Sequence, residues 1–459
     1  MLDRIDTLVI LGAGGDLTSR LLLPGLASFL ASSRGRELSV IGVDRAPQSD
    51  ADWHAKVTAS FATEPSALAK KVVSHTRYLQ GDATSAPDLT RVLSEATGRV
   101  ALYLALPPAV AGLACKALST MTLPPGITLA LEKPFGTDFA SARELNRLLE
   151  RMLPEEQLFR VDHFLGKSTV LNLLGLRFAN RIFEPLLSAP NVERVEITFG
   201  ETLGLEGRAG YYDKAGALVD MIQSHLLLVL ALTAMEPPAS LDADDLRGAM
   251  AQVLRATHSW KRNGKSSKRA RYSAGEVDGR AMPSYADEAG VNPAGKTETL
   301  AEVTLSIDNW RWAGVPFILR SGKAMGEPRQ EILVVFKPVP HLPAGLSGAA
   351  GPSCLRISMK PATLDLDLVI NGQGDPFELE RVALHSDLGE GEMSAYGEVL
   401  AELLDCNTTL SVRDDIAEQC WRIVSPVLAA WRKDEVPLQT YPAGSDGPPD
   451  WHVGQVPAS

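Results

Sequence analysis

The chain has 459 residues, is 45% hydrophobic and 22% charged, and carries a formal net charge of −11. This length and balance are typical of a soluble globular protein with two large domains or about three average ones. The acidic charge argues against nucleic acid as a partner, and no apolar run reaches the roughly 20 residues of a membrane span.

The cysteines give no sign of a metal site or a disulfide framework. Cys115, Cys354, Cys406 and Cys420 are scattered, without CxxC or Cys/His ligand spacing. The first residues lead into a strand pattern without the features of a signal peptide. We therefore expect a cytoplasmic protein that holds no metal.

A glycine-rich segment follows the first predicted strand. Thr7–Leu11 is a short apolar run typical of a buried parallel strand, and a helical pattern runs from Leu22 to Leu30. Strand, glycine turn and helix bind a dinucleotide pyrophosphate through backbone N–H groups and the helix N-terminus. Because the usual third glycine is a leucine, a plain turn stays an alternative. The residues expected to contact the dinucleotide are Gly12, Gly14, Gly15, Asp16 and Leu17.

The second predicted strand, Ser39–Val43, ends in Asp44 and Arg45. A carboxylate at this point usually binds the ribose hydroxyls of NAD, whereas an arginine binds the 2′-phosphate of NADP. Both are present, so the pattern does not decide between the two cofactors.

Further apolar runs at Val100–Leu106 and Thr128–Leu131 alternate with helical segments. The alternation predicts a doubly wound parallel sheet, in a Rossmann-like dinucleotide-binding domain over residues 1–158. The last strand ends in Glu132–Gly136 (EKPFG). Ligands of such sheets bind beyond the carboxyl ends of the strands, which places Lys133 at the site, with a solvated surface turn as the alternative. The peptide before Pro134 is a candidate for the cis form.

The segment Arg160–Lys167 (RVDHFLGK) concentrates charged groups. If a helix continues through Gly166, His163 and Lys167 are four residues apart on one face, where two cationic donors suit a phosphate dianion. Asp162 then points elsewhere and has a different role. The alternative is a salt-bridged turn.

Alternating apolar residues at Val192–Phe199 predict a half-buried antiparallel strand. Similar patterns follow without regular helices between them, at Leu300–Ile307, Phe317–Leu319, Ile332–Phe336, Leu355–Met359 and Leu364–Ile370. They predict an α+β domain over residues 159–459, with a large antiparallel sheet covered by helices on one face. Such sheets often form dimer interfaces, so we expect a homodimer or homotetramer.

Two helices are predicted beside this sheet. Gly216–Met235 carries Asp220, Ser224 and His225 in an otherwise apolar sequence. In an α-helix Asp220 and His225 are about 140° apart, able to border one wide pocket; a core histidine is the alternative. The other helix, Ala395–Leu404, is expected to cap the sheet.

Two polar segments are expected to lack regular structure. Lys261–Arg271 is strongly basic, but without interleaved aromatic residues it indicates a solvated loop. Tyr441–Pro449 is rich in proline and glycine and indicates irregular chain.

Taken together, the motifs resemble the glucose-6-phosphate dehydrogenase family along nearly the whole chain. The matching segments are Gly12–Pro24, Ala105–Pro108, Glu132–Gly136, Arg160–Lys167, Glu206–His225, Glu236–Pro238, Gly275–Gly279, Asp308–Pro316, Arg320–Met325, Trp421–Val424 and Tyr441–Gly444.

The resemblance implies an enzyme that oxidises C1 of glucose 6-phosphate. His225 matches the base that removes the proton of the C1 hydroxyl, and Asp162 matches the carboxylate that hydrogen-bonds this histidine. The resemblance implies substrate contacts from Lys133, His163, Lys167, Glu201, Asp220 and Lys323. For the cofactor it adds Pro107 and Lys133 to the glycine loop, Asp44 and Arg45. Arg45 matches the 2′-phosphate arginine and favours NADP, with NAD possible.

Several positions depart from the family pattern. Phe164 replaces a tyrosine near the substrate phosphate, and Gly14 replaces a hydroxylic residue near the cofactor phosphates. Leu21, Ser224 and Lys360 replace a lysine, an asparagine and a glutamine. Two alternatives therefore stay open: a dehydrogenase of a different aldose or aldose phosphate, and a non-catalytic nucleotide-binding paralogue.

Overall fold

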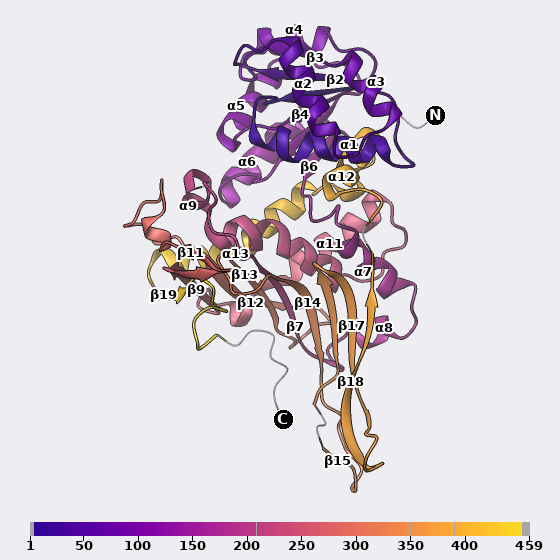
Figure 1. The fold of residues 1–459 in the computed structure, drawn as a ribbon, viewed down its shortest axis with the longest axis vertical. Coiled ribbons are helices and arrows are strands. Elements are labelled where there is room, and N and C mark those ends of the chain that lie inside the picture. The colour runs from indigo at the N-terminus through magenta and orange to yellow at the C-terminus, as the bar shows by residue number, and fades with distance from the viewer. Residues whose placement is uncertain (1–3, 208, 349–350, 390, 452–459) are drawn as a thin grey trace. The chain divides into compact units, whose positions relative to one another are not determined.

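The computed structural model describes residues 4–207, 209–348, 351–389 and 391–451 (Figure 1). The chain divides into two compact units, each made from several segments. The first unit comprises Met1–Leu171, Pro237–Ala251 and Gly391–Trp421. The second comprises Asn172–Glu236, Gln252–Glu390 and Arg422–Ser459.

The first unit contains a parallel sheet of six strands in the order β3-β2-β1-β4-β5-β6. The strands are β1 (Thr7–Leu11), β2 (Ser39–Asp44), β3 (Arg77–Gln80), β4 (Val100–Leu104), β5 (Thr128–Glu132) and β6 (Leu158–Val161). Every residue of β1 and β4 is buried, as in strands covered on both faces. The predicted Rossmann-like sheet is confirmed.

Helices connect these strands and supply the core of the unit. They are α1 (Leu23–Ala31), α2 (Asp50–Phe61), α3 (Ala67–His75), α4 (Ala86–Ser94), α5 (Pro108–Leu118) and α6 (Phe139–Glu150). A π-helical turn, Thr18–Leu22, precedes α1, and Pro24 lies in the first turn of α1. Because helical backbone already begins at Asp16, Pro24 lies inside a continuous helical run, directly after the π-helical turn.

Helix α12 (Ala395–Leu404) belongs to the same core although it lies far away in the sequence. It packs against α1, and its buried side chains join those of Leu8 and Ile10 from β1 in one hydrophobic cluster. The prediction that this helix caps the antiparallel sheet is therefore wrong. Its apolar face identified a buried helix but not the surface that it covers.

The second unit contains a sheet of eleven strands, ordered β15-β18-β17-β16-β14-β7-β13-β12-β9-β19, with β8 also paired to β12. The strands are β7 (Val192–Gly200), β8 (Thr257–Ser259), β9 (Ser267–Ser273), β12 (Leu300–Ile307), β13 (Phe317–Gly322), β14 (Arg329–Phe336), β15 (Ser347–Gly348), β16 (Cys354–Met359), β17 (Ala362–Asn371), β18 (Glu378–Asp387) and β19 (Leu438–Pro442). Three pairs are parallel, namely β7–β13, β9–β19 and β15–β18. The large, mostly antiparallel sheet is confirmed. A separate hairpin pairs β10 (Gly275–Val277) with β11 (Arg280–Met282).

One long helical segment packs against this sheet. It consists of α9 (Ala209–Ala217), a π-helix (Leu218–Leu226) and α10 (Leu227–Ala234), and the π-helix contacts β12 and β13. By length and composition alone it could cross a membrane, but 83% of its most apolar window is buried inside the protein. It is a core helix. The remaining helices are α7 (Ser168–Phe178), α8 (Phe183–Leu186), α11 (Ala243–Ala256) and α13 (Asp414–Arg432).

Two predictions of irregular chain are wrong in part. The basic segment forms strand β9 from Ser267 onward, where Arg269 is buried and donates to the carbonyl oxygen of Val436 at 2.8 Å. The segment that begins at Tyr441 starts inside β19, and its tyrosine is buried. In both cases pairing with a neighbouring strand outweighs the polar local composition.

Candidate functional site

The residues predicted to contact a dinucleotide lie along one edge of the parallel sheet. The glycine loop follows β1, Asp44 ends β2, and Pro107 lies between β4 and α5. Carboxyl ends of parallel strands meet at the same edge, and β1 lies between β2 and β4. The strand order reverses there, which is where open α/β sheets bind their ligands.

The loop after β1 is a tight turn with little room for side chains. Gly12 has a φ of 93°, and a Cβ atom there would lie 2.2 Å from the carbonyl oxygen of Ala105. The Gly12 carbonyl oxygen accepts from the N–H of Gly15 at 3.0 Å and from the hydroxyl of Thr18 at 2.9 Å. Helical structure begins at Asp16. Bare backbone followed by a helix N-terminus fits the pyrophosphate of a dinucleotide.

Leu17 stands where the usual third glycine would be and packs against the hydrophobic core of the first unit. Gly14 and Asp16 are exposed, and Gly15 is half-buried. The part of the loop that a ligand can reach is therefore Gly14 to Asp16.

Charged groups surround this loop. The Asp44 carboxylate accepts from the N–H groups of Gly14 at 2.9 Å and of Arg45 at 2.7 Å. The Lys56 Nζ donates to the carbonyl oxygen of Ala13 at 2.7 Å. Burial lowers the pKa of Lys56, against the opposite effect of the Asp44 charge. The Arg45 side chain is exposed.

Lys133 follows β5 and is half-buried, and its peptide bond with Pro134 is cis. The preceding residue, Glu132, accepts hydrogen bonds from the hydroxyls of Tyr103 at 2.5 Å and Tyr396 at 3.3 Å. Burial raises the pKa of Glu132 to about 7, while the Tyr103 hydrogen bond and the Lys133 charge act against that rise. Lys133 thus follows directly after a half-buried, hydrogen-bonded carboxylate.

The segment after β6 is a turn and not the helix on which one prediction depended. The N–H groups of residues 165–167 each donate to the carbonyl oxygen three residues earlier, and α7 begins only after them. His163 and Lys167 therefore do not share a helical face, and that prediction is wrong. Gly166 explains the tight path, because a Cβ atom there would lie 2.3 Å from the carbonyl oxygen of Ala395.

Asp162 begins this turn and is only 1% exposed. Its carboxylate accepts from the N–H of Phe164 at 2.9 Å. Burial raises the pKa of Asp162 to about 6, against the positive charges of His163 and Lys133. A buried carboxylate with a perturbed pKa is a candidate functional residue.

The two phosphate-binding candidates both lie against aromatic rings. The His163 ring stacks on Tyr396 with centroids 5.5 Å apart and an interplanar angle of 14°, and its edge meets Phe164. The Lys167 Nζ lies 3.9 Å from the centroid of Phe164, a cation–π contact. Phe164 is buried. The phenylalanine that replaces the family's tyrosine thus supports Lys167 through its ring face.

His225 and Asp220 lie in the π-helix of the second unit. The N–H of Leu227 donates to the carbonyl oxygen of Ile222, five residues back. A turn of a π-helix takes more residues than a turn of an α-helix. The angle between Asp220 and His225 around the helix axis is therefore smaller than the 140° predicted for an α-helix. His225 is buried, and Asp220 accepts from the Tyr211 hydroxyl at 3.3 Å.

Glu201 and Lys323 follow the ends of β7 and β13, which pair in parallel with Gly200 opposite Gly322. This register brings the two residues together, and the Lys323 Nζ lies 2.7 Å from a Glu201 carboxylate oxygen. The same ammonium lies 5.2 Å from the ring centroid of Tyr212. The pair supplies hydrogen-bond donors and acceptors for a polar ligand.

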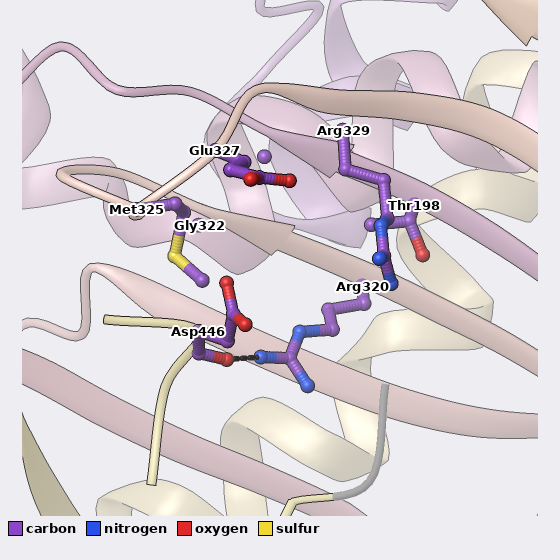
Figure 2. A pocket seen from close by; sticks show the side chains of 8 residues that line it. Thr198, Arg320, Gly322, Met325, Glu327, Arg329 and Asp446 are labelled. Atoms are coloured by element: carbon purple, nitrogen blue, oxygen red, sulfur yellow. Dashed lines mark hydrogen bonds between the residues drawn. The ribbon is translucent and has the colours of Figure 1, made fainter. Parts of the chain in front are cut away.

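A small cavity lies on the same sheet (Figure 2). Its volume is about 30 Å³, and it is lined by Thr198, Gly200, Arg320, Gly322, Met325, Glu327, Arg329 and Asp446. That volume holds a water molecule or two but not a sugar phosphate. None of the residues predicted to contact the substrate lines this cavity.

The sequence reading missed the two tyrosines that bind Glu132. Tyr396 lies 264 residues from Glu132, in the segment Ala395–Leu404 that the sequence predicts only as a helix covering the antiparallel sheet. Glu132 itself stands in a matched motif beside Lys133, which was the only available signal. Among the residues that the structure describes, no group of three His, Cys, Asp or Glu side chains could hold a metal ion.

Comparisons with known proteins cover both units. The NAD binding domain of glucose-6-phosphate dehydrogenase matches residues 9–172, and the C-terminal domain of glucose-6-phosphate dehydrogenase matches residues 174–453. Glucose-6-phosphate 1-dehydrogenase of Mycolicibacterium smegmatis is 38% identical to this chain, over 97% of each chain.

Solved structures of glucose-6-phosphate dehydrogenases also match nearly the whole chain. The crystal structure of glucose-6-phosphate 1-dehydrogenase from Mycobacterium avium is 32% identical, with a TM-score of 0.84 over 97% of this chain and 95% of that one. A glucose-6-phosphate dehydrogenase in complex with its substrate glucose-6-phosphate is 28% identical, with a TM-score of 0.88 over 98% and 97% of the two chains.

Proposed function

The chain belongs to the glucose-6-phosphate dehydrogenase family, and on this premise we propose that it oxidises D-glucose 6-phosphate at C1 to 6-phospho-D-glucono-1,5-lactone. This reaction is the first step of the oxidative pentose phosphate pathway. The observation that carries the proposal is that Asp162, His163, Lys167 and His225 are all present in motifs that match the family, although Phe164 and Ser224 beside them depart from it, within a match over both units. A bound NADP or NAD supplies the acceptor for the C1 hydride.

His225 is proposed as the general base. Its imidazole takes the proton of the C1 hydroxyl as the hydride leaves, so that the carbonyl of the lactone can form. Asp162 is proposed to orient that imidazole and to stabilise the imidazolium. Its burial supports the role, because a carboxylate with few solvent contacts acts strongly on a nearby charge.

The remaining candidates are proposed to hold the sugar phosphate. His163 and Lys167 offer donors to the phosphate, and their aromatic supports limit the side-chain freedom lost on binding. Lys133 is proposed to lie between substrate and nicotinamide. Glu201, Asp220 and Lys323 are proposed to bind sugar hydroxyls, and the Glu201–Lys323 pair supports this because it is already formed.

The base assignment has a direct test. We expect His225→Asn to lower kcat by roughly 10²- to 10⁴-fold, the usual contribution of a general base. The Kd for glucose 6-phosphate, measured by calorimetry, should change by only a few fold. His341→Asn, at an exposed histidine, is the control and should leave both values unchanged. Near-normal turnover of His225→Asn would contradict the assignment.

Phe164 favours a second candidate, a dehydrogenase of another aldose or aldose phosphate. Its ring supports Lys167 but offers no hydroxyl to a phosphate. A matrix of kcat/KM values for NAD and NADP against free and phosphorylated aldoses decides between the substrates. A clear preference for glucose 6-phosphate removes the second candidate, and any sugar-dependent reduction removes the non-catalytic one.

We also propose a cytoplasmic homodimer or homotetramer. No disulfide joins the four cysteines, all of which lie in the described part of the chain, in keeping with a reducing compartment. The hairpin of β17 and β18 exposes three large apolar side chains, Ile370, Phe377 and Leu384, each between 48% and 61% exposed. An exposed apolar group of this kind supports self-association. Sedimentation of the purified protein, with Leu384→Glu as the comparison, tests this.

A further inference from the structure

Gly14 and Asp44 contact each other at the dinucleotide edge of the parallel sheet. The Gly14 N–H donates to the Asp44 Oδ2 at 2.9 Å, and the Arg45 N–H donates to the Oδ1 at 2.7 Å. Backbone donors thus hold both carboxylate oxygens. The carboxylate is fixed at the reachable part of the glycine loop.

The glycine is what permits this arrangement. A Cβ atom at Gly14 would lie 2.9 Å from the Asp44 Oδ2, closer than real Cβ contacts. Gly14 does not have the positive φ that Gly12 has, so space and not backbone conformation requires it. Because the Oδ2 is the end of a flexible side chain, a larger residue at this position would displace the carboxylate and weaken its hydrogen bond to the loop.

The position of this carboxylate determines what it can bind. It stands at the carboxyl end of β2, beside the turn after β1, where the adenosine ribose of a dinucleotide binds. A carboxylate accepts hydrogen bonds from two neighbouring ribose hydroxyls but repels a 2′-phosphate. Two cations lie near this carboxylate, Arg45 and Lys56, and Lys56 commits one of its three N–H donors to the carbonyl oxygen of Ala13.

We propose that Gly14 and Asp44 are a coupled pair that determines cofactor specificity, holding a carboxylate at the ribose so that the protein uses NAD at least as well as NADP. The inference rests on the proposed function, which supplies the reaction. It predicts a cofactor preference opposite to the preference for NADP that Arg45 alone would indicate. Gly14, a departure from the family pattern, and the carboxylate of Asp44 are joined in the structure by a direct hydrogen bond.

Two measurements on the full-length protein test the pair. Calorimetry gives the Kd of NAD and of NADP without any sugar, and steady-state kinetics with glucose 6-phosphate give the ratio of kcat/KM for the two. For the unmodified protein we expect an NAD-to-NADP ratio of at least one. Asp44→Ala should lower that ratio at least tenfold, because it removes the charge that opposes the 2′-phosphate.

Gly14→Ala tests the coupling, since it adds only the Cβ atom that displaces the carboxylate. It should lower the ratio in the same direction as Asp44→Ala. The double variant should show no further decrease, since the two changes act on one interaction. Glu37→Ala is the charge-matched control: Glu37 precedes β2 at its amino end, pairs with Lys71 at 3.3 Å, and should leave the ratio unchanged.

Each contrary result has a distinct meaning. An Asp44→Ala ratio within twofold of the unmodified protein overturns the role of Asp44. Additive effects in the double variant, or no effect of Gly14→Ala, overturn the coupling. If Gly14→Ala is insoluble, Gly14→Ser replaces it with the same expectation. If the proposed reaction is wrong, turnover will be absent. The ratio of the Kd values for NAD and NADP from calorimetry would still test the roles of Gly14 and Asp44.

Discussion

The burial of Asp162, which is proposed to orient His225, lowers the free energy of unfolding at neutral pH. Its carboxylate is 1% exposed, and burial raises its pKa to about 6, against an ordinary value near 3.9. The folded state therefore binds this proton more tightly than the unfolded state. The free energy of unfolding is highest, for this group, below about pH 4 and falls as the pH rises toward 6.

We therefore predict that Asp162→Asn raises the melting temperature at pH 7 while it abolishes most activity. The gain in unfolding free energy is at most about 3 kcal/mol, the equivalent of a shift of two pKa units. It should shrink as the pH falls through the window between 6 and 4. Calorimetric scans at several pH values measure it, with exposed Asp287→Asn as the control. A variant that is less stable at pH 7 would contradict the prediction.

Some residues of the candidate site could be placed from sequence motifs, and others could not. The sequence predicts Asp44 and Lys133 at strand ends but does not predict β6, the strand that Asp162 follows. The observed sheet puts all three residues at one edge because carboxyl ends of parallel strands coincide. Glu132 and its partner Tyr396 were not predictable in this way. Their contact joins residues 264 positions apart, and neither position carries a local signal for the other.

Among the elements, the helix that carries His225 depends on the turn before it. Gly216 has a φ of 67°, and a Cβ atom there would lie 2.3 Å from the Glu298 Oε1. The Glu298 carboxylate accepts from the N–H of Leu218, the first residue of the π-helix, at 3.0 Å. Glu298 is buried, and burial raises its pKa to about 7. The glycine thus allows a carboxylate to cap the π-helix.

We predict that Gly216→Ala lowers the unfolding free energy by about 2–4 kcal/mol, from left-handed backbone strain and displacement of Glu298. Turnover should fall as well, because the start of the π-helix moves. Gly210→Ala is the matched control, since Gly210 lies in α9 with nothing within 4 Å of its added Cβ. That change should be neutral or stabilising by up to about 1 kcal/mol. Equal melting temperatures for the two variants would refute the role of the turn.

Elements with a strong local pattern were predictable, and those set by pairing or by an unusual helix were not. Thr7–Leu11 and Leu300–Ile307 begin and end as expected, because apolar runs and alternation report burial directly. The π-helix Leu218–Leu226 escaped prediction because periodicity arguments assume 3.6 residues per turn. Strand β9 was not predicted because its three arginine and lysine residues hide the strand pattern. The strand forms because it pairs with β12 and β19.

At the scale of the whole molecule, the core of the first unit requires a late part of the chain. Side chains of α12, among them Leu400 and Leu403, are buried in the same cluster as those of β1 and α1. Without that helix, part of the apolar surface of α1 loses its cover. A hydrophobic pattern reveals such a helix but not its destination, which is why α12 was assigned to the other sheet.

We predict that residues 1–171 expressed alone aggregate or lack a cooperative thermal transition. The same fragment joined through a flexible linker to residues 391–421 should be soluble and melt cooperatively, because α12 then covers its core face. Circular dichroism during heating and dinucleotide binding measure the difference. The joined fragment with Leu400→Asp should behave like residues 1–171 alone. Cooperative folding of residues 1–171 without α12 would contradict this.

The return of the chain to its first unit also has a consequence during synthesis. The residues that complete this core leave the ribosome about 250 residues after Leu171. At about 5–20 residues per second this delay is roughly 12–50 s, far longer than the time that a small domain needs to collapse. During this delay, the part of α1 that α12 covers in the finished protein stays exposed on the nascent chain. Chaperones that bind such faces during translation, and codon choices that set the length of this pause, should affect the yield of active protein more than its final stability.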